Sequence, residues 1–247
     1  MLAVLEDDEV VNTNRTEQVR AHDGGRFLGH VALPDGGSGP GLVVIQEIFG
    51  VNGYIKCVCG RLAKLGYVAM APDLYWRLSP GVAIDEKDSD GLQRAFGYVG
   101  QLDFAKAADD ATAALEHLRG LPEVASGKAG ILGFCLGGGI AYMVAALSDP
   151  VTCISYYGSA VPDALGLARQ VRCPILFHFG DADDYIPAKK QEAVREAFAH
   201  HAGTEFHVHE GAGHAFDNHN AAVMYQERAA RQAWIQTIEF LKRTLPL

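Results

Sequence analysis

The sequence predicts an α/β fold whose mostly parallel sheet is covered by helices on both faces. Short apolar runs, rich in β-branched residues and bounded by Gly or Pro, alternate along the chain with stretches of helical spacing. Strands separated by helices of this length pair in parallel, and a parallel sheet is buried on both faces. The chain has 247 residues and is 49% hydrophobic, which suffices for one sizeable core. We therefore expect a single domain over residues 1–247.

The elements of the N-terminal half follow from these patterns in order. Residues 26–33 (RFLGHVAL) have a shorter apolar content than the later strands and are expected to form an antiparallel hairpin at the sheet edge. Residues 41–48 (GLVVIQEI) and 67–74 (YVAMAPDL) predict buried strands, and the helical spacing between them predicts a helix at 53–65. Residues 76–91 are polar and irregular, which predicts a surface excursion or lid.

The C-terminal half continues the alternation of strands and helices. Its apolar runs predict strands at 128–134, 151–157, 174–180 and 205–211. Its stretches of helical spacing predict helices at 102–119, 136–147, 189–201 and about 222–243.

The acidic balance of the chain argues against polyanionic partners. There are 30 Asp and Glu against 21 Lys and Arg, whereas nucleic acids and anionic membranes require clustered basic residues. No apolar run approaches the roughly 20 residues that span a bilayer. The N-terminal stretch is acidic where a signal peptide would be basic and then apolar. We expect a cytoplasmic protein whose partner is a small molecule; the sequence does not indicate an oligomeric state.

The cysteines do not form a disulfide framework. Their number is odd, their spacing is irregular, and a chain of this size needs no covalent staples. We interpret all of them as reduced thiols: Cys57, Cys59, Cys135, Cys153 and Cys173.

One cysteine lies in a pattern that carries chemistry. The stretch GFCLG around Cys135 has the G-x-S-x-G spacing of a nucleophile elbow, with cysteine in the serine position. The nucleophile of such an elbow occupies a strained turn, and side chains two residues away on either side would collide with the neighbouring strand and helix. The turn also places the sulfur at a helix N-terminus, where partial positive charge favours a thiolate. The alternative is a buried cysteine among closely packed small residues.

Candidate partners for this cysteine follow two later strands. Asp181, Asp183 and Asp184 crowd the end of the strand at 174–180, where an acid would orient a histidine, although surface acids near a helix N-terminus are the alternative. His214 lies in a glycine-bounded loop after the strand at 205–211. Ligands of open α/β sheets bind at the carboxyl ends of the strands. The order nucleophile, acid, histidine is that of the α/β-hydrolases, so we expect a catalytic triad.

With these motifs, the chain resembles the dienelactone hydrolases, also called carboxymethylenebutenolidases, from about residue 20 to the C-terminus. The resemblance implies the α/β-hydrolase fold, a carboxylic ester hydrolase and no cofactor. The family pattern G-x-x-D-x-x-V-P falls on Gly180, Asp183, Ile186 and Pro187, and so selects Asp183 as the acid. The stretches that carry the resemblance are QEIFGVN (46–52), GYVAMAPDLY (66–75), GFCLGG (133–138), YYG (156–158), GDADDYIP (180–187) and GAGHAF (211–216).

The resemblance also implies how the cysteine works. The Cys135 thiolate would attack a carbonyl and form a thioester, and the backbone N–H groups of Leu136 and Ile48 would stabilise the oxyanion. His214, oriented by Asp183, would move the protons. Family members place the counterpart of Glu47 against the resting cysteine and swing it away when substrate binds. Alternatively, Glu47 forms a structural ion pair with Arg77.

Substrate identity is less defined. Family members that open dienelactone clamp its carboxylate with two arginines. One matches Arg77, but Asn218 stands where the other would fall. The loss of a bidentate cation weakens the binding of an anionic lactone, so a neutral lactone, an activated or aryl ester, or a neutral phosphotriester is plausible. Trp76 is a candidate aromatic wall, with core or lid packing as the alternative, and Tyr157 is a further candidate for substrate binding.

Other classes of function stay open. The chain could be a binding module with a decayed triad, although nucleophile, acid and histidine are all present. A thiol-redox role lacks an obvious resolving cysteine beside Cys135. No metal site is expected, because Cys57 and Cys59 lie on different faces of one helix and the remaining histidines form no ligand set. Those histidines are His200, His201, His207, His209 and His219.

Overall fold

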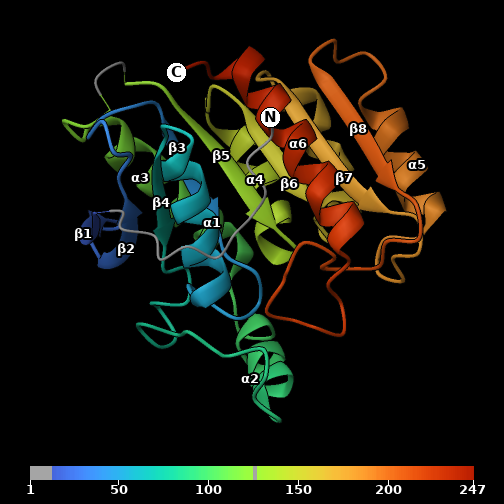
Figure 1. Cartoon of the computed structure of the whole chain (residues 1–247), viewed down its shortest axis with the longest axis horizontal. Helices are drawn as coiled ribbons and strands as arrows, with labels where there is room; N and C mark the ends of the chain where they lie inside the picture. Colours follow the sequence, from blue (N-terminus) through green and yellow to red (C-terminus); the bar gives the residue numbers. More distant parts are fainter. Residues whose placement is uncertain (1–12, 125–126) are drawn as a thin grey trace.

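The computed structural model of the chain describes residues 13–124 and 127–247, and within them an eight-stranded mixed sheet forms the centre (Figure 1). The spatial order of the strands is β1-β2-β4-β3-β5-β6-β7-β8. The strands are β1 (Asn14–Arg20), β2 (Arg26–Ala32), β3 (Gly41–Ile45), β4 (Val68–Pro72), β5 (Ala129–Phe134), β6 (Cys153–Tyr156), β7 (Ile175–Gly180) and β8 (Thr204–His209). From β4 through β3 to β8 the pairing is parallel, and β2 pairs antiparallel with both β1 and β4.

Helices cover both faces of the sheet. α1 and α6 lie on one face, where the Arg61 guanidinium of α1 stacks 3.8 Å from the ring of Trp234 on α6. α3, α4, η1 and α5 follow one another on the opposite face. The helices are α1 (Gly53–Lys64), α2 (Gly91–Val99), α3 (Phe104–Arg119), α4 (Leu136–Leu147), the 3-10 helix η1 (Val161–Gln170), α5 (Ala188–Ala197) and α6 (Glu227–Thr244). The predicted architecture of a mostly parallel, doubly covered sheet is confirmed.

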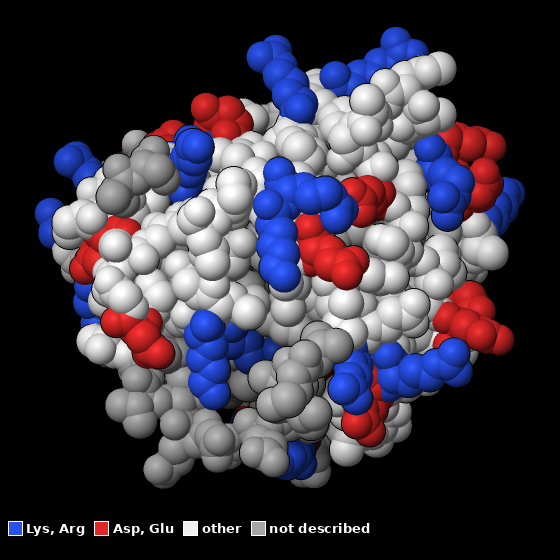
Figure 2. Space-filling model, turned by 45° about the horizontal axis from the view of Figure 1, so that its top comes forward, with Lys and Arg blue, Asp and Glu red and all other residues white. Residues whose placement is uncertain are grey.

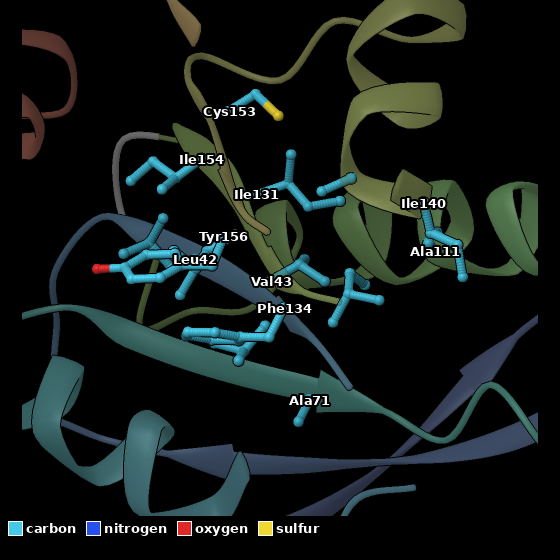
Figure 3. Close-up of a cluster of buried hydrophobic side chains, with 14 of the residues drawn as sticks. Leu42, Val43, Ala71, Ala111, Ile131, Phe134, Ile140, Cys153, Ile154 and Tyr156 are labelled. Carbon is cyan, nitrogen blue, oxygen red and sulfur yellow. The ribbon is translucent and has the colours of Figure 1, made fainter. Parts of the chain in front are cut away.

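The core is continuous through the central strands. Figure 3 shows Val43 of β3 and Ile131 of β5 on the face of the sheet that carries Ala111 of α3 and Ile140 of α4. Leu42 of β3 and Ile154 of β6 lie on the opposite face, and all six side chains are fully buried. These strands are buried on both faces, which explains why their sequences are continuous apolar runs rather than alternating ones. A rigid centre of this kind fixes the carboxyl ends of β3, β5, β7 and β8.

The predicted hairpin is present, and its other strand is β1, which pairs with β2 so that Arg20 faces Arg26. The strand predicted at 41–48 ends at Ile45, three residues before its predicted end. Beyond that point the side-chain oxygen of Gln46 accepts a hydrogen bond from the Leu74 N–H at 3.2 Å, so the ladder to β4 gives way to a side-chain contact. The residues freed in this way, Glu47 and Ile48, enter a loop at the carboxyl edge of the sheet.

The segment predicted as an excursion has little regular structure up to Asp90 and then enters α2, a helix that the sequence did not reveal. Its middle is held to the loop after β3 by an isolated antiparallel bridge between Gly50 and Ala83. α2 extends away from the body of the molecule at the lower edge of Figure 1.

Charged side chains of both signs lie on the face drawn in Figure 2. On the part of one face that the described residues form, Figure 2 shows basic and acidic side chains interspersed, without a continuous basic patch. None of the described helices has the length and apolar character to cross a membrane.

Candidate active site

Cys135 lies at the turn between β5 and α4, at the carboxyl edge of the sheet. Its backbone has φ 52° and ψ −116°, a strained conformation for a residue with a Cβ atom. The flanking glycines make this turn possible. A Cβ atom on Gly133 would collide with the Gly137 carbonyl, and one on Gly137 would collide with the carbonyls of Ile45 and Gln46. The predicted nucleophile elbow therefore has the close backbone contacts that its sequence pattern indicates.

His214 connects the sulfur to a carboxylate. Its Nε2 lies 3.0 Å from Cys135 Sγ, and its Nδ1 lies 2.8 Å from Asp183 Oδ2. The other oxygen of Asp183 accepts hydrogen bonds from the backbone N–H groups of Tyr185 at 2.8 Å and Ile186 at 3.2 Å. These contacts fix the carboxylate, and the carboxylate in turn fixes the imidazole with Nε2 directed at the sulfur.

The structure distinguishes between the three acids that follow β7. Asp183 is buried and bonded to His214, whereas Asp181 accepts a hydrogen bond from the Gly211 N–H and Asp184 is exposed. Gly180 is necessary for this arrangement, because a Cβ atom there would collide with the Ala212 carbonyl of the loop that carries His214. The acid and the histidine loops can therefore approach each other only with glycine at this position.

The environment of His214 favours its charged form. Burial alone would lower its pKa, but the neighbouring Cys135 sulfur and the Asp183 carboxylate outweigh burial and raise the pKa to about 10. An imidazolium 3.0 Å from the sulfur stabilises a thiolate. The rings of Tyr185 and Tyr157, with centroids 4.8 Å and 5.3 Å from that of His214, pack against the imidazole.

Glu47 is buried in the loop after β3, with 2% of its surface exposed. Burial raises its pKa to about 7, and the nearby Glu86 adds to the rise, while Asn218 and His214 oppose it. Its Oε2 accepts a hydrogen bond from Asn218 Nδ2 at 2.6 Å. Its Oε1 has no hydrogen-bond partner among the described residues. The alternative in which Glu47 pairs with Arg77 is wrong, because Asn218 occupies that role.

Asn218 lies at the site but is committed to the protein. Its side-chain oxygen accepts hydrogen bonds from the N–H groups of Asn220 and Ala221, and its Nδ2 donates to Glu47 and also to Glu86 Oε1 at 3.0 Å. Asn52 Nδ2 donates to the same oxygen of Glu86 at 2.7 Å. The sequence did not single out Glu86 or Asn52 for this site.

Asp217, next to Asn218, belongs to a separate cluster. It accepts a hydrogen bond from Tyr54 Oη at 2.7 Å and lies 3.7 Å from Arg61 Nη1. Burial raises its pKa to about 6. Arg61 and Tyr54 both belong to α1, so this carboxylate links the histidine loop to the helix behind it.

The structure does not bring Arg77 and Trp76 to the triad. Arg77 makes a bidentate contact to Asp110, with Nε 2.9 Å from Oδ2 and Nη2 2.8 Å from Oδ1, and a further contact of 2.6 Å to Asp23. Trp76 Nε1 donates to Asp110 at 2.8 Å, and the Trp76 ring stacks on Phe27 with centroids 5.6 Å apart. These contacts correct the expectation of an arginine free to clamp a substrate, because carboxylates of the protein already occupy its donors.

The two residues predicted to form the oxyanion hole lie at the elbow and in the loop after β3. Leu136 is the first residue of α4, so its N–H has no acceptor within the helix. Ile48 lies in the loop that packs against the elbow, and its carbonyl accepts a hydrogen bond from Tyr75 Oη at 3.0 Å. The contact of Gly137 with the chain leaving β3 keeps these two segments together. The assignment of the two N–H groups stays a prediction.

Tyr157 is the candidate substrate-binding residue that the structure does place beside the triad. Its backbone has φ 37°, its side chain is fully buried, and its hydroxyl has no hydrogen-bond partner among the described residues. Across residues 13–124 and 127–247, no group of His, Cys, Asp or Glu side chains has an arrangement that could hold a metal ion. A surface hollow of about 490 Å³ beside α6 contains none of the candidate residues.

Comparison with known proteins agrees with this geometry. The sequence model of the dienelactone hydrolase family matches residues 27–245. A carboxymethylenebutenolidase of Pseudomonas sp. (strain P51) is 36% identical over 229 residues, covering 93% of this chain and 95% of that protein. A second, from Pseudomonas putida, is 33% identical over 223 residues, with 90% and 94% covered.

Solved structures give the same result. The crystal structure of a dienelactone hydrolase-like promiscuous phosphotriesterase, P91, from metagenomic libraries superimposes with a TM-score of 0.78. The two chains are 26% identical, and the match covers 94% of this chain and 98% of P91. The match with the family spans most of the chain and includes every candidate triad residue. This chain therefore belongs to the dienelactone hydrolase family and is a hydrolase with the α/β-hydrolase fold.

Proposed function

We propose that this protein hydrolyses an activated ester or a lactone through a thioester on Cys135, with His214 and Asp183 completing a Cys-His-Asp triad. The observation that carries the proposal is the continuous contact from Asp183 Oδ2 through His214 to Cys135 Sγ, at 2.8 Å and 3.0 Å. A buried structural cysteine would not require a strained backbone or an oriented histidine.

The first half of the reaction forms the thioester. The Cys135 thiolate attacks the substrate carbonyl carbon, and the carbonyl electrons move to oxygen. The N–H groups of Leu136 and Ile48 donate hydrogen bonds to this oxyanion. As the tetrahedral intermediate collapses, the bond to the leaving alcohol breaks and the alcohol takes the proton from the His214 imidazolium.

The second half releases the acid. Neutral His214 accepts a proton from water, whose oxygen attacks the thioester carbonyl. Collapse of the second tetrahedral intermediate breaks the C–S bond, releases the carboxylic acid and expels the thiolate, while the proton taken from water stays on His214 and restores the imidazolium–thiolate pair. Asp183 keeps the imidazole in the tautomer with Nδ1 protonated throughout.

Glu47 tunes this pair through its charge. A neutral Glu47 leaves the thiolate undisturbed, whereas an ionised Glu47 opposes both the thiolate and the developing oxyanion. Because burial places its pKa at about 7, its charge changes within the physiological range.

The reaction class is tested with purified protein, Cys135→Ala and Asp183→Asn on a neutral 4-nitrophenyl ester and on dienelactone. Cys135→Ala should abolish turnover, and Asp183→Asn should lower kcat/KM by about 10²- to 10⁴-fold because the histidine loses its orientation. Intact-mass measurement of quenched wild-type enzyme should show an acyl adduct on Cys135.

The matched control is Cys173→Ala, which removes a buried thiol remote from the elbow and should keep full turnover. Substantial activity in Cys135→Ala would remove the cysteine from the mechanism. Turnover without an adduct, even under rapid quenching, would favour a general-base mechanism.

A further inference from the structure

Glu86 is a carboxylate in the active site that the reaction scheme above does not use. Its Oε1 accepts hydrogen bonds from Asn218 Nδ2 at 3.0 Å and Asn52 Nδ2 at 2.7 Å. The same Asn218 nitrogen donates to Glu47 Oε2 at 2.6 Å. One amide group therefore holds two carboxylates side by side, an arrangement that we name the Glu47–Asn218–Glu86 bridge.

The position of Glu86 is fixed by the backbone around it. The Ile84 N–H donates to the Phe49 carbonyl at 2.9 Å, and the Val51 N–H donates to the Val82 carbonyl at 3.2 Å. Asn52 donates to the Ile84 carbonyl and also caps α1, since its side-chain oxygen accepts from the Ile55 N–H at 3.3 Å. Glu86 is thus anchored to the loop that carries Glu47 and Ile48.

Among the residues that the structure describes, the arginines nearest to this region are already paired and do not offset the two acids. Arg61 lies against Asp217 and the Trp234 ring, and Arg77 is held by Asp110 and Asp23. Asn218 carries no charge, and its side-chain amide already donates to both carboxylates. The His214 imidazolium offsets the charge of Glu47, so it is beside Glu86 that a substrate group meets negative charge.

Two buried polar atoms face this region without a partner. Glu47 Oε1 and the Tyr157 hydroxyl form no hydrogen bond of standard geometry with a described residue, although the two side chains are close enough to influence each other. Both side chains are buried, and both lie at the triad, since Glu47 interacts with the charge of His214 and the Tyr157 ring packs on its imidazole. An atom buried without a partner costs free energy, and a ligand that supplies a donor relieves that cost.

We propose that Glu86 is a specificity-determining residue, which together with Glu47 excludes substrates that bear a carboxylate near the scissile bond and restricts this hydrolase to esters and lactones without an anionic group. The proposal rests on the hydrolase function proposed above. The repulsion acts between charges that are partly removed from water, where Coulomb forces are less screened than at the surface.

The test uses three 4-nitrophenyl esters of matched length and equal leaving group. Their acyl chains end in a methyl group (pentanoate), a carboxylate (glutarate monoester) or a trimethylammonium group (4-trimethylammoniobutanoate). For wild-type enzyme, kcat/KM for the glutarate ester should be lower than for the pentanoate by about tenfold or more. Glu86→Gln keeps the shape of the side chain but removes its charge. It should reduce the difference in kcat/KM between the pentanoate and the glutarate ester by about fivefold or more.

The matched control is Asp88→Asn. It removes one negative charge from the same segment, but Asp88 is exposed and pairs with Arg94 on the surface. Asp88→Asn should leave the ratio of glutarate to pentanoate within about twofold of wild type, because water and salt screen surface charges. Thermal melting of both variants checks that the fold is intact.

The proposal is overturned if Glu86→Gln leaves the ratio unchanged, or if Asp88→Asn changes it as much. Absence of turnover with all three esters would contradict the proposed function instead. In that case calorimetry measures the affinity of Cys135→Ala for the intact glutarate and pentanoate esters, and equal affinity for the two overturns the role of Glu86.

Discussion

Cys135 occupies a backbone conformation that costs free energy for any residue with a Cβ atom, of the order of 1 to 3 kcal/mol. Its N–H donates to the Tyr156 carbonyl at 3.0 Å, and the glycines on both sides allow the chain to turn sharply. The strain holds the sulfur out of the packing and directs it at His214. The rest of the fold therefore offsets the strain that positions the Cys135 sulfur.

Arg77 is bonded to two carboxylates of the protein, Asp110 and Asp23. The family resemblance implies a substrate contact, whereas Asp110, with 1% of its side chain exposed, accepts hydrogen bonds from Nε and Nη2 of Arg77 in a fork. Asp110 belongs to α3, so this ion pair joins the excursion to the helix layer. No local pattern in the sequence links residues 77 and 110.

Arg77→Ala should therefore reduce stability rather than specificity. Removing the cation leaves a buried carboxylate unpaired and should lower the free energy of unfolding by about 2 to 4 kcal/mol in urea denaturation. Arg94→Ala, which breaks the exposed pair with Asp88, is the control and should cost no more than about 1 kcal/mol. A selective rise in KM for the anionic glutarate ester, without loss of stability, would restore the substrate-binding role.

At the scale of elements, the sequence predicted the strands and helices that alternate with regular spacing, and missed those without it. The triad could be predicted because Cys135, Asp183 and His214 each follow a strand, and parallel strands end at one edge. η1 contains Pro162 and Gly166, and α2 begins without a side-chain cap, so neither carries a clear helix signal.

Glu86 and Asn52 could not be assigned from sequence for a related reason. Glu86 lies in a polar stretch with several other acids, and nothing local distinguishes it from a solvated one. Its place in the site depends on the backbone bridge between Gly50 and Ala83. Asn52 carries a local signal as the N-cap of α1, but its second contact is tertiary.

Two glycine-to-alanine changes in helices should have opposite effects. Gly137→Ala in α4 forces a Cβ atom into the carbonyls of Ile45 and Gln46 and should destabilise the protein by about 1 to 3 kcal/mol or prevent folding. Gly97→Ala in α2 meets open space and should stabilise by about 0.5 to 1 kcal/mol. Chemical denaturation compares the two. If Gly137→Ala is as stable as wild type, the elbow is not closely packed.

At the scale of the whole molecule, buried ionisable groups shape the dependence of stability on pH. The pKa of Glu47 is raised to about 7 and that of Asp217 to about 6, mainly by burial. Between the unfolded and folded pKa values the native state keeps protons that the unfolded chain has released. Stability from these carboxyls therefore falls as pH rises from about 4 to 7.

Buried histidines act in the opposite direction over part of that range. Burial lowers the pKa of His178 well below its usual value and that of His209 to about 4, so their contribution is lost as pH falls below about 6.5. The raised pKa of His214 contributes stability that is fully present below about pH 6.5 and is lost progressively as pH rises from there to about 10. The free energy of unfolding of the wild type therefore depends on pH through contributions that partly cancel.

Glu47→Gln isolates one of these slopes. The variant should gain stability relative to wild type as pH rises from 5 to 8, by about 2 to 3 kcal/mol, because it no longer ionises in a buried site. Urea denaturation at both pH values measures the difference, with the exposed Glu192→Gln as the control. Parallel curves for wild type and Glu47→Gln would mean that Glu47 ionises in the folded protein as easily as in water.

The backbone bonds between Phe49 and Ile84 and between Val51 and Val82 also bear on how such enzymes diversify. They join the segment that carries Glu86 to the loop that carries Glu47 and Ile48, so neither piece is an independent module. A graft of residues 82–86 from a relative would bring a new neighbour for Asn218 but also displace the loop that carries Glu47 and Ile48, unless residues 47–52 are transferred with it. Residues 47–52 and 82–86 are far apart in the sequence but joined in the fold, so an exchange that preserves the site has to transfer both segments together.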